Sequence, residues 1–239
     1  MTTKEERDIC YSKKRFLKFS DNFSDIIQSN GLVMIQGNNV SENITSKNDS
    51  IIILGNNNTG KIFSEKGIII HGDNTCEAAI TNGSVTIYGK NDAKQDITVK
   101  GDVVISKDNS SQKLSSGGCI SIGGSNISKR IKAKDNISIK GDNNSGDIIS
   151  SEGNVIIEGN NTSGSIRANN VTIKGNNKSE EIISYGDVVI DGKAKFNNSH
   201  IMAAGMVHIK GVISGEVSIS AKKIWLESEI CCNVKLSLN

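Results

Sequence analysis

Proline is absent from this chain of 239 residues, and aromatic residues make up only 4% of it. Because proline has no backbone N–H to donate, it is excluded from the interior of sheets, so its absence fits a chain whose strands are paired almost throughout. The scarcity of aromatic side chains excludes a thick globular core, whereas 36% hydrophobic residues are enough for a thin one. We therefore expect a thin molecule built from strands.

The chain also lacks the features of several functional classes. Its formal net charge is only +2, which gives no electrostatic footprint for a nucleic-acid partner. No apolar run approaches the roughly 18 residues of a transmembrane helix. The N-terminal stretch MTTKEERDICYSKKRF is charged and has no apolar core like that of a secretory signal. We therefore expect a cytoplasmic protein.

Residues suited to catalysis or metal binding are few and scattered. The five cysteines stand at no metal-ligand spacing, and free thiols in a reducing cytosol are the simplest account of them. No acidic pair recurs as a carboxylate-based glycosidase requires, and no phosphate-binding motif occurs. We expect no catalytic, cofactor-binding or metal-binding residues, no cofactor and no enzymatic activity. The cysteines are Cys10, Cys76, Cys119, Cys231 and Cys232.

What the chain has instead is one short phrase, repeated almost from end to end. In GNVIIEGNNTSGSIRANNVTIKG, residues 153–175, the pattern V-x-I-x-G occurs twice. The first aliphatic residue of the phrase recurs every 16 to 19 residues, and another aliphatic follows two positions later. Self-similarity at a fixed period indicates a repeat architecture. The first positions are Val33, Ile51, Ile68, Val85, Val103, Ile120, Ile137, Val155, Val171, Val188, Val207 and Ile224.

The spacing within the phrase selects the type of repeat. Apolar residues alternate at period two, which is typical of strands, and a unit of about 17 residues is too short for a strand with a crossover helix. Each unit therefore predicts one coil of a solenoid whose coils stack about 4.8 Å apart. We predict an all-β, single-stack parallel β-solenoid of about twelve coils over residues 31–239, right-handed because parallel crossovers favour that hand.

A third aliphatic column and a column of mostly small residues complete the predicted interior. The small residue, such as Ser46 or Ala133, comes two positions after the third aliphatic and should point inward with it. Between strands, Gly and Asn predict tight turns with positive φ, and the stacked Asn predict ladders of side-chain amides. The third column is Ile44, Ile62, Ile80, Ile97, Leu114, Ile131, Ile148, Ile166, Ile182, Ile201, Val217 and Val234.

The segment before the first phrase, residues 1–30, has two interpretations. A solenoid needs an element that covers the open core of its first coil, so this segment is predicted to be an N-terminal cap. The stretch YSKKRFLKFS, residues 11–20, also combines cations with aromatic residues, a pattern that binds anionic membrane surfaces. The candidate membrane contacts are Lys13, Lys14, Arg15, Phe16, Lys18 and Phe19.

The repeated phrase resembles that of bactofilins, bacterial polymer-forming cytoskeletal proteins. The resemblance rests on [VI]-x-[VI]-x-G, a polar turn and G-x-I-x-[SA], and is clearest in residues 153–175 and 186–226. Related solenoids such as FapA-like proteins share the pattern. The resemblance implies a cytosolic, nucleotide-independent filament of β-helices joined end to end, often with a short N-terminal membrane-targeting segment.

Two surfaces are candidates for contacts with partners. The last phrase ends in Val234, Leu236 and Leu238, which alternate with polar residues and predict a final strand whose free edge is the assembly interface for a second copy. Outward positions between the first two aliphatic columns predict an apolar stripe. We therefore expect a structural scaffold, a subunit of a bactofilin-like filament. The alternative is a solitary binding module, such as a bacterial effector or adaptor, that presents this stripe to a protein. The stripe is Ile52, Ile69, Val104, Ile156 and Val189.

Overall fold

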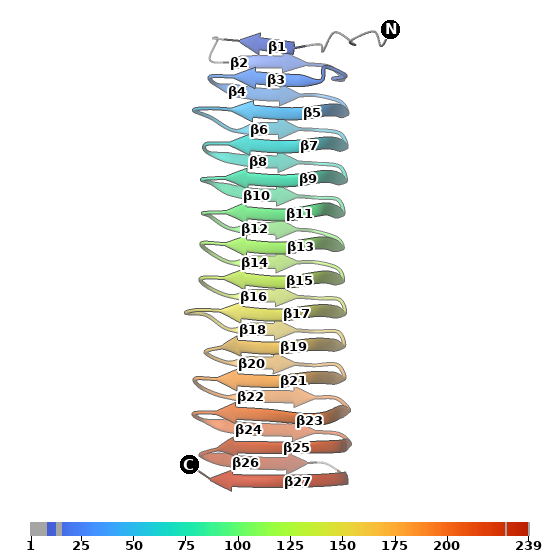
Figure 1. Cartoon of the computed structure of the whole chain (residues 1–239), viewed down its shortest axis with the longest axis vertical. Helices are drawn as coiled ribbons and strands as arrows, with labels where there is room; N and C mark the ends of the chain where they lie inside the picture. Colours follow the sequence, from blue (N-terminus) through green and yellow to red (C-terminus); the bar gives the residue numbers. More distant parts are fainter. Residues whose placement is uncertain (1–8, 13–15, 228, 239) are drawn as a thin grey trace, which may run out of the picture. The chain divides into compact units, whose positions relative to one another are not determined.

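The computed structural model describes residues 9–12, 16–227 and 229–238, and for Ile9, residues 16–19 and Cys232 it describes the backbone alone. These residues form a parallel β-solenoid of about 13 turns with a repeat near 17 residues, and this part of the chain contains no helix. Each turn contributes one strand to each of two sheets, and each strand stacks on its equivalent in the next turn (Figure 1). We call the odd-numbered strands long and the even-numbered strands short, because from β5 on the odd-numbered strand of each turn is the longer one, although β1 and β3 have only 4 residues each. The predicted all-β solenoid is confirmed.

The chain divides into two compact units, of which the first is Met1–Gln112. In this unit the long strands pair in sequence order in one sheet and the short strands in another. The long strands are β1 (Ile9–Ser12), β3 (Ile26–Ser29), β5 (Asn39–Ser46), β7 (Asn57–Ser64), β9 (Asn74–Thr81) and β11 (Asn91–Val99). The short strands are β2 (Phe16–Phe19), β4 (Leu32–Ile35), β6 (Ile51–Ile53), β8 (Gly67–Ile70), β10 (Ser84–Ile87) and β12 (Val103–Ile105).

The second unit is Lys113–Asn239 and repeats the same plan, and β13 (Asn109–Ser116) contains the point of division. Its long strands are β15 (Asn126–Ala133), β17 (Asn143–Ser150), β19 (Asn161–Ala168), β21 (Asn177–Ser184), β23 (Ala194–Ala203), β25 (Ile213–Ala221) and β27 (Ile230–Leu238). Its short strands are β14 (Ile120–Ile122), β16 (Ile137–Ile139), β18 (Val155–Ile157), β20 (Val171–Ile173), β22 (Val188–Asp191), β24 (Met206–Lys210) and β26 (Lys223–Glu227).

The interior of each turn is narrow and is filled by the predicted columns. In β18 the first and third residues, Val155 and Ile157, are fully buried, and Ile156 between them faces outward. The long strand β17 buries two pairs of residues separated by an outward pair, so that it bends around the interior. Burying an Ile or Val side chain contributes about 1.5–3 kcal/mol, and every turn repeats this contribution.

The stacked asparagines lie inside the solenoid, where they form the amide ladders expected from the sequence. Each Nδ2–H donates to the Oδ1 of the asparagine one turn later, at 2.7–2.8 Å in the first unit and 2.8–2.9 Å in the second. These buried amides are therefore satisfied by one another. The ladder of the second unit ends at Asn177, whose Nδ2 faces Ala194 in the next turn and has no acceptor among the described residues. The ladder asparagines are Asn22, Asn39, Asn57, Asn74, Asn91 and Asn109, and Asn126, Asn143, Asn161 and Asn177.

Except for Gly211, the described glycines of the phrase do not adopt the positive φ that Gly-rich turns can use. Among the described residues, positive φ occurs only at Asn198, Gly211 and Gly215, so the Gly-Asn turns do not need it. The phrase glycines are required because stacked turns approach closely. A Cβ on Gly55 or on Gly159 would lie 2.5 Å from the carbonyl oxygen of the equivalent glycine one turn earlier.

The predicted interior register is wrong at one turn. Strand β9 places Ala79 and Thr81 inside, each 2% exposed, and turns Ile80 outward with 49% exposure. The segment AAIT offers an apolar residue at either parity, and pairing with Ile62 in the preceding strand selects Ala79. A shift of one residue moves every side chain to the opposite face.

The parallel pairing also extends into the segment for which a cap or a membrane contact is predicted. Strand β1 pairs with β3, and β2 pairs with β4, so that Leu17 and Phe19 align with Val33 and Ile35. The backbone of residues 17–19 thus occupies the place of a V-x-I phrase. This additional turn raises the total from the twelve phrases in the sequence to about 13 turns.

Candidate functional site

The outward positions of the short strands align into one column in the first unit. Register pairing places Ile52, Ile69 and Val104 in this column together with Met34 and Thr86. Ile52 and Ile69 are half-buried by their neighbours, and Val104 is 38% exposed. The structure therefore brings three of the five predicted stripe residues together on one face.

Two further columns flank this one in the first unit. On one side lie large side chains, of which Leu54 is 42% and Tyr88 50% exposed, and the His71 and Tyr88 ring centroids are 4.8 Å apart. On the other side, the turns of β6, β8 and β10 carry small side chains or none, whereas the turn of β4 carries Leu32. We call this three-column surface of β4–β12 the apolar face, and Asp102 lies at its rim. Its large column is Leu54, His71 and Tyr88, and its small column is Ser50, Gly67 and Ser84.

The large column was missed by the sequence reasoning, which considered only the middle residue of each V-x-I phrase. Its members follow the second aliphatic residue directly, as Leu54 follows Ile53. Aligning all phrases and comparing that position down the repeat would have found the column, because strand alternation puts it on the same face as the stripe.

In the second unit the predicted stripe is interrupted. Ile156 and Val189 share a column, but Thr172 lies between them and Ser138 precedes them. The outward position two residues after the stripe residue holds a charged side chain whose sign alternates from turn to turn. We call this column the charged ladder. Its members are Lys140, Glu158, Lys174, Asp191, Lys210 and Glu227.

Two neighbouring members of the charged ladder form an ion pair between turns. Lys174 Nζ lies 2.9 Å from Glu158 Oε1. The hydrogen bond from Lys174, together with its positive charge, lowers the pKa of Glu158 below its ordinary value. Because these side chains are exposed, the pair contributes little to stability. The ladder therefore gives the outer surface of the second unit a polar character and no catalytic group.

At the C-terminal end of the column that contains Ile156 and Val189, a histidine packs against a tryptophan. The ring of His208 is stacked on Trp225 with centroids 4.5 Å apart and an interplanar angle of 10°. Lys223 Nζ lies 5.7 Å from the Trp225 ring centroid on the same strand. His208 is buried, whereas Trp225 remains 47% exposed. Trp225 is therefore an exposed aromatic side chain on the outer surface of β26 that packs against a buried histidine.

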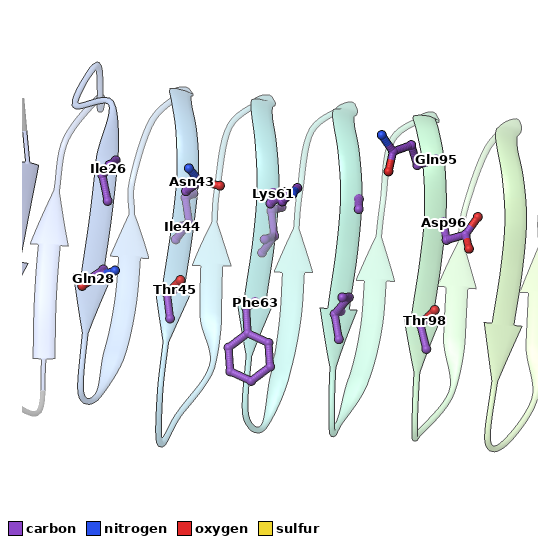
Figure 2. Close-up of a pocket in the computed structure, with 13 residues that line it drawn as sticks. Ile26, Gln28, Asn43, Ile44, Thr45, Lys61, Phe63, Gln95, Asp96 and Thr98 are labelled. Atoms are coloured by element: carbon purple, nitrogen blue, oxygen red, sulfur yellow. The ribbon is translucent and has the colours of Figure 1, made fainter. Parts of the chain in front are cut away.

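A shallow groove of about 560 Å³ lies on the outer surface of the long strands in the first unit. Ala78 has a small side chain there, and Phe63 and the outward-turned Ile80 form an apolar wall. Figure 2 shows Gln28, Thr45, Phe63 and Thr98 at matching levels of β3, β5, β7 and β11, and Ile80 of β9 is paired between Phe63 and Thr98. The sequence reasoning missed this groove because it assigned Ile80 to the interior. Its lining offers hydroxyls, amides, one lysine and one aspartate, with no nucleophile–base pair.

The last turn of the described solenoid is open. Val234, Leu236 and Leu238 pair in register with Val217, Ile219 and Ala221, which are at most 3% exposed. Leu236 is nevertheless 55% and Leu238 72% exposed, because no described strand pairs with β27 on its far side. The predicted assembly residues therefore occupy interior columns whose outer end is uncovered.

The candidate membrane contacts fall on a part of the chain about which little is described. Lys13, Lys14 and Arg15 lie outside the described residues. For Phe16, Lys18 and Phe19 only the backbone of β2 is described. Within the described part of the chain, no helix is long and apolar enough to cross a membrane.

The remaining chemistry-bearing residues are dispersed. Among the described residues, no group of three His, Cys, Asp or Glu side chains is placed to hold a metal ion. Cys10, Cys76, Cys119 and Cys231 are free thiols. Burial raises the pKa of Cys76 to about 11, which keeps this thiol protonated and unreactive at neutral pH.

Comparisons with protein-family models, with curated proteins and with solved structures return no match.

Proposed function

We propose that the protein is a non-enzymatic structural scaffold in the cytoplasm, a subunit of a bactofilin-like, nucleotide-independent filament that assembles through solenoid ends. The observation that carries this proposal is the uncovered last turn. Leu236 is 55% exposed, although the residue paired with it one turn earlier, Ile219, is fully buried. An apolar end with an unpaired strand edge is a template for another chain.

A second copy can cover this end through a two-fold axis at Val234. Antiparallel pairing of β27 with β27 of the other copy then places Ile230 opposite Leu238 on the inner side. On the outer side it places Lys235 opposite Asn233, so that like charges do not meet directly. Such an isologous contact is closed at this end, and growth into filaments requires a second contact at the other end of each subunit.

The test compares two lysine substitutions at exposed apolar residues of the second unit. Leu236→Lys places a charge on the open end, whereas Met202→Lys places one on an outward position of β23, where Met202 is 43% exposed. We expect light scattering and negative-stain microscopy to show assemblies for the wild type and for Met202→Lys. Leu236→Lys should lose the end contact while keeping the circular dichroism of the folded protein.

The outcome also separates this function from the second candidate, a solitary protein-binding module. That candidate is favoured by the apolar face, because a contiguous exposed apolar surface marks an interaction site. If the wild type stays monomeric at tens of micromolar and Leu236→Lys behaves identically, the filament proposal fails and the binding module becomes the better account.

A further inference from the structure

The apolar face of β4–β12 is unusual for a parallel sheet. Parallel sheets are normally covered on both faces, because their strands are apolar on both sides. Here the inner face is packed, but the outer face presents Met34, Ile52 and Ile69 next to the large column. Among the described residues of this face, Asp102 at the rim is the one Asp, Glu, Lys or Arg side chain. A partner that recognises charge, such as a nucleic acid or an acidic peptide, finds no complementary group here.

We propose that the apolar face binds the apolar face of a second copy of this chain, side by side, with the stacking directions of the two solenoids parallel. The two-fold axis runs along the central column, so that each turn meets the equivalent turn of the other copy. This lateral contact lies on strands of the first unit and is independent of the end contact at Leu236.

The shapes of the flanking columns select this arrangement. Rotation about an axis along the central column exchanges the two flanking columns, so that large side chains meet small ones. A two-fold axis perpendicular to the stacking direction would instead oppose large to large and small to small, which leaves gaps and clashes. In the proposed pair, large opposes small in the three central turns, where Leu54 opposes Ser50, His71 opposes Gly67, and Tyr88 opposes Ser84. At the edge turn of β4, Leu32 opposes Gln36.

The position of Asp102 supports the same choice. In the proposed pair it opposes Ser106, a hydroxyl at the edge of the face. In the perpendicular arrangement it would oppose Leu32 and lose water without gaining a partner from the other copy. The central residues meet their own equivalents, so Ile69 contacts Ile69 close to the middle of the interface.

The size of the face predicts a weak contact. Five turns about 4.8 Å apart span roughly 20–25 Å, and three columns of side chains cover roughly 15–20 Å, or about 400 Å² on each copy. This is about half of the roughly 800 Å² per partner in a stable complex. We therefore expect isolated subunits to pair only at high micromolar concentration, whereas subunits already joined into filaments would pair through many faces at once.

The first experiment separates the lateral contact from the end contact by starting from Leu236→Lys. Sedimentation velocity of this variant, from tens to hundreds of micromolar, should show a monomer–dimer equilibrium. Adding Ile69→Glu should abolish the dimer, because the two-fold axis brings the two carboxylates together. Ile156→Glu is the matched control, since it lies in the corresponding column of the second unit with 39% exposure and should leave the dimer unchanged.

The second experiment tests the orientation by disulfide formation, in a background where Cys10, Cys119, Cys231 and Cys232 are changed to Ser. Mixing Ser84→Cys with Tyr88→Cys protein should give a cross-linked heterodimer, and neither variant alone should cross-link.

Three results would overturn the lateral contact. The first is the absence of any dimer in the Leu236→Lys protein. The second is an equal loss of dimer from Ile69→Glu and from Ile156→Glu. The third is cross-linking of Tyr88→Cys with Leu54→Cys instead of with Ser84→Cys. Failure of the end contact would appear separately, as identical masses of the wild type and Leu236→Lys.

Discussion

In the first unit the column that follows the short strands presents Leu54, His71 and Tyr88, whereas in the second unit the same column presents the charged ladder from Lys140 to Glu227. Inside, the two units are alike. Both bury the same aliphatic columns and both contain an asparagine ladder. The comparison shows that the interior specifies the turn, while the outer positions are free to differ without changing it.

The physical reason lies in the alternation of the strands. Inward side chains contact the turns before and after them, so a substitution there is felt by three turns. Outward side chains contact water and one or two neighbours in the same column. The following predictions test this division between inner and outer positions, from the largest expected effect to the smallest.

The largest difference in stability is expected between substitutions of an inward residue and of the outward residue next to it in sequence. Ile139 is fully buried between stacked turns, so Ile139→Asp buries an unpaired charge and should lower the free energy of unfolding by several kcal/mol. Lys140→Asp, at the next residue, should change it by about 0.5 kcal/mol or less. Denaturant titration of both variants measures the difference, and equal losses would contradict the register.

Breaking the asparagine ladder should have an intermediate effect that depends on position. Asn143→Ala removes the acceptor of Asn126 and the donor to Asn161, and should lower the free energy of unfolding by about 1–3 kcal/mol. Asn177→Ala is the control at the ladder end: it removes the acceptor of Asn161 and Ser179, but the Nδ2–H that it deletes has no acceptor among the described residues. Asn177→Ala should lower the free energy of unfolding by less than Asn143→Ala does, and thermal unfolding of the two variants measures the difference. A larger loss for Asn177→Ala would show that the ladder does not act through its hydrogen bonds.

Reversing one charge of the charged ladder should have the smallest effect. Glu158→Lys removes the exposed pair with Lys174 and should shift the thermal midpoint by little more than its measurement error. Because Lys174 lowers the pKa of Glu158 in the folded protein, the small stabilisation is present above the ordinary pKa of 4.5 and is lost as pH falls through the folded value. The wild type should therefore approach the variant in stability under acidic conditions. A loss comparable to that of Ile139→Asp would mean that the outer column supports the fold.

The sequence predicts most of the fold, because a solenoid turn is a local structure repeated. Residues that alternate at period two, such as Val155 and Ile157, can only be buried together, and a 17-residue repeat places each of them against its equivalent in the next turn. The repeat also predicts the asparagine ladder, because Asn143 and Asn161 occupy the same position of successive phrases and therefore stack. The apolar character of the final strand also follows from the phrase, because Leu236 belongs to an interior column.

Other features were decided by tertiary structure, since they depend on which neighbours a residue meets across turns. Ile80 is outward because Ala79 stacks against Ile62, and nothing within the segment AAIT selects between the two registers. Gly55 is required because the backbone of the preceding turn lies too close for a Cβ, which local turn chemistry does not reveal. The apolar face becomes a surface only when the residues after each phrase are stacked, because Leu54 and Tyr88 are far apart in sequence and share a face through the strands between them.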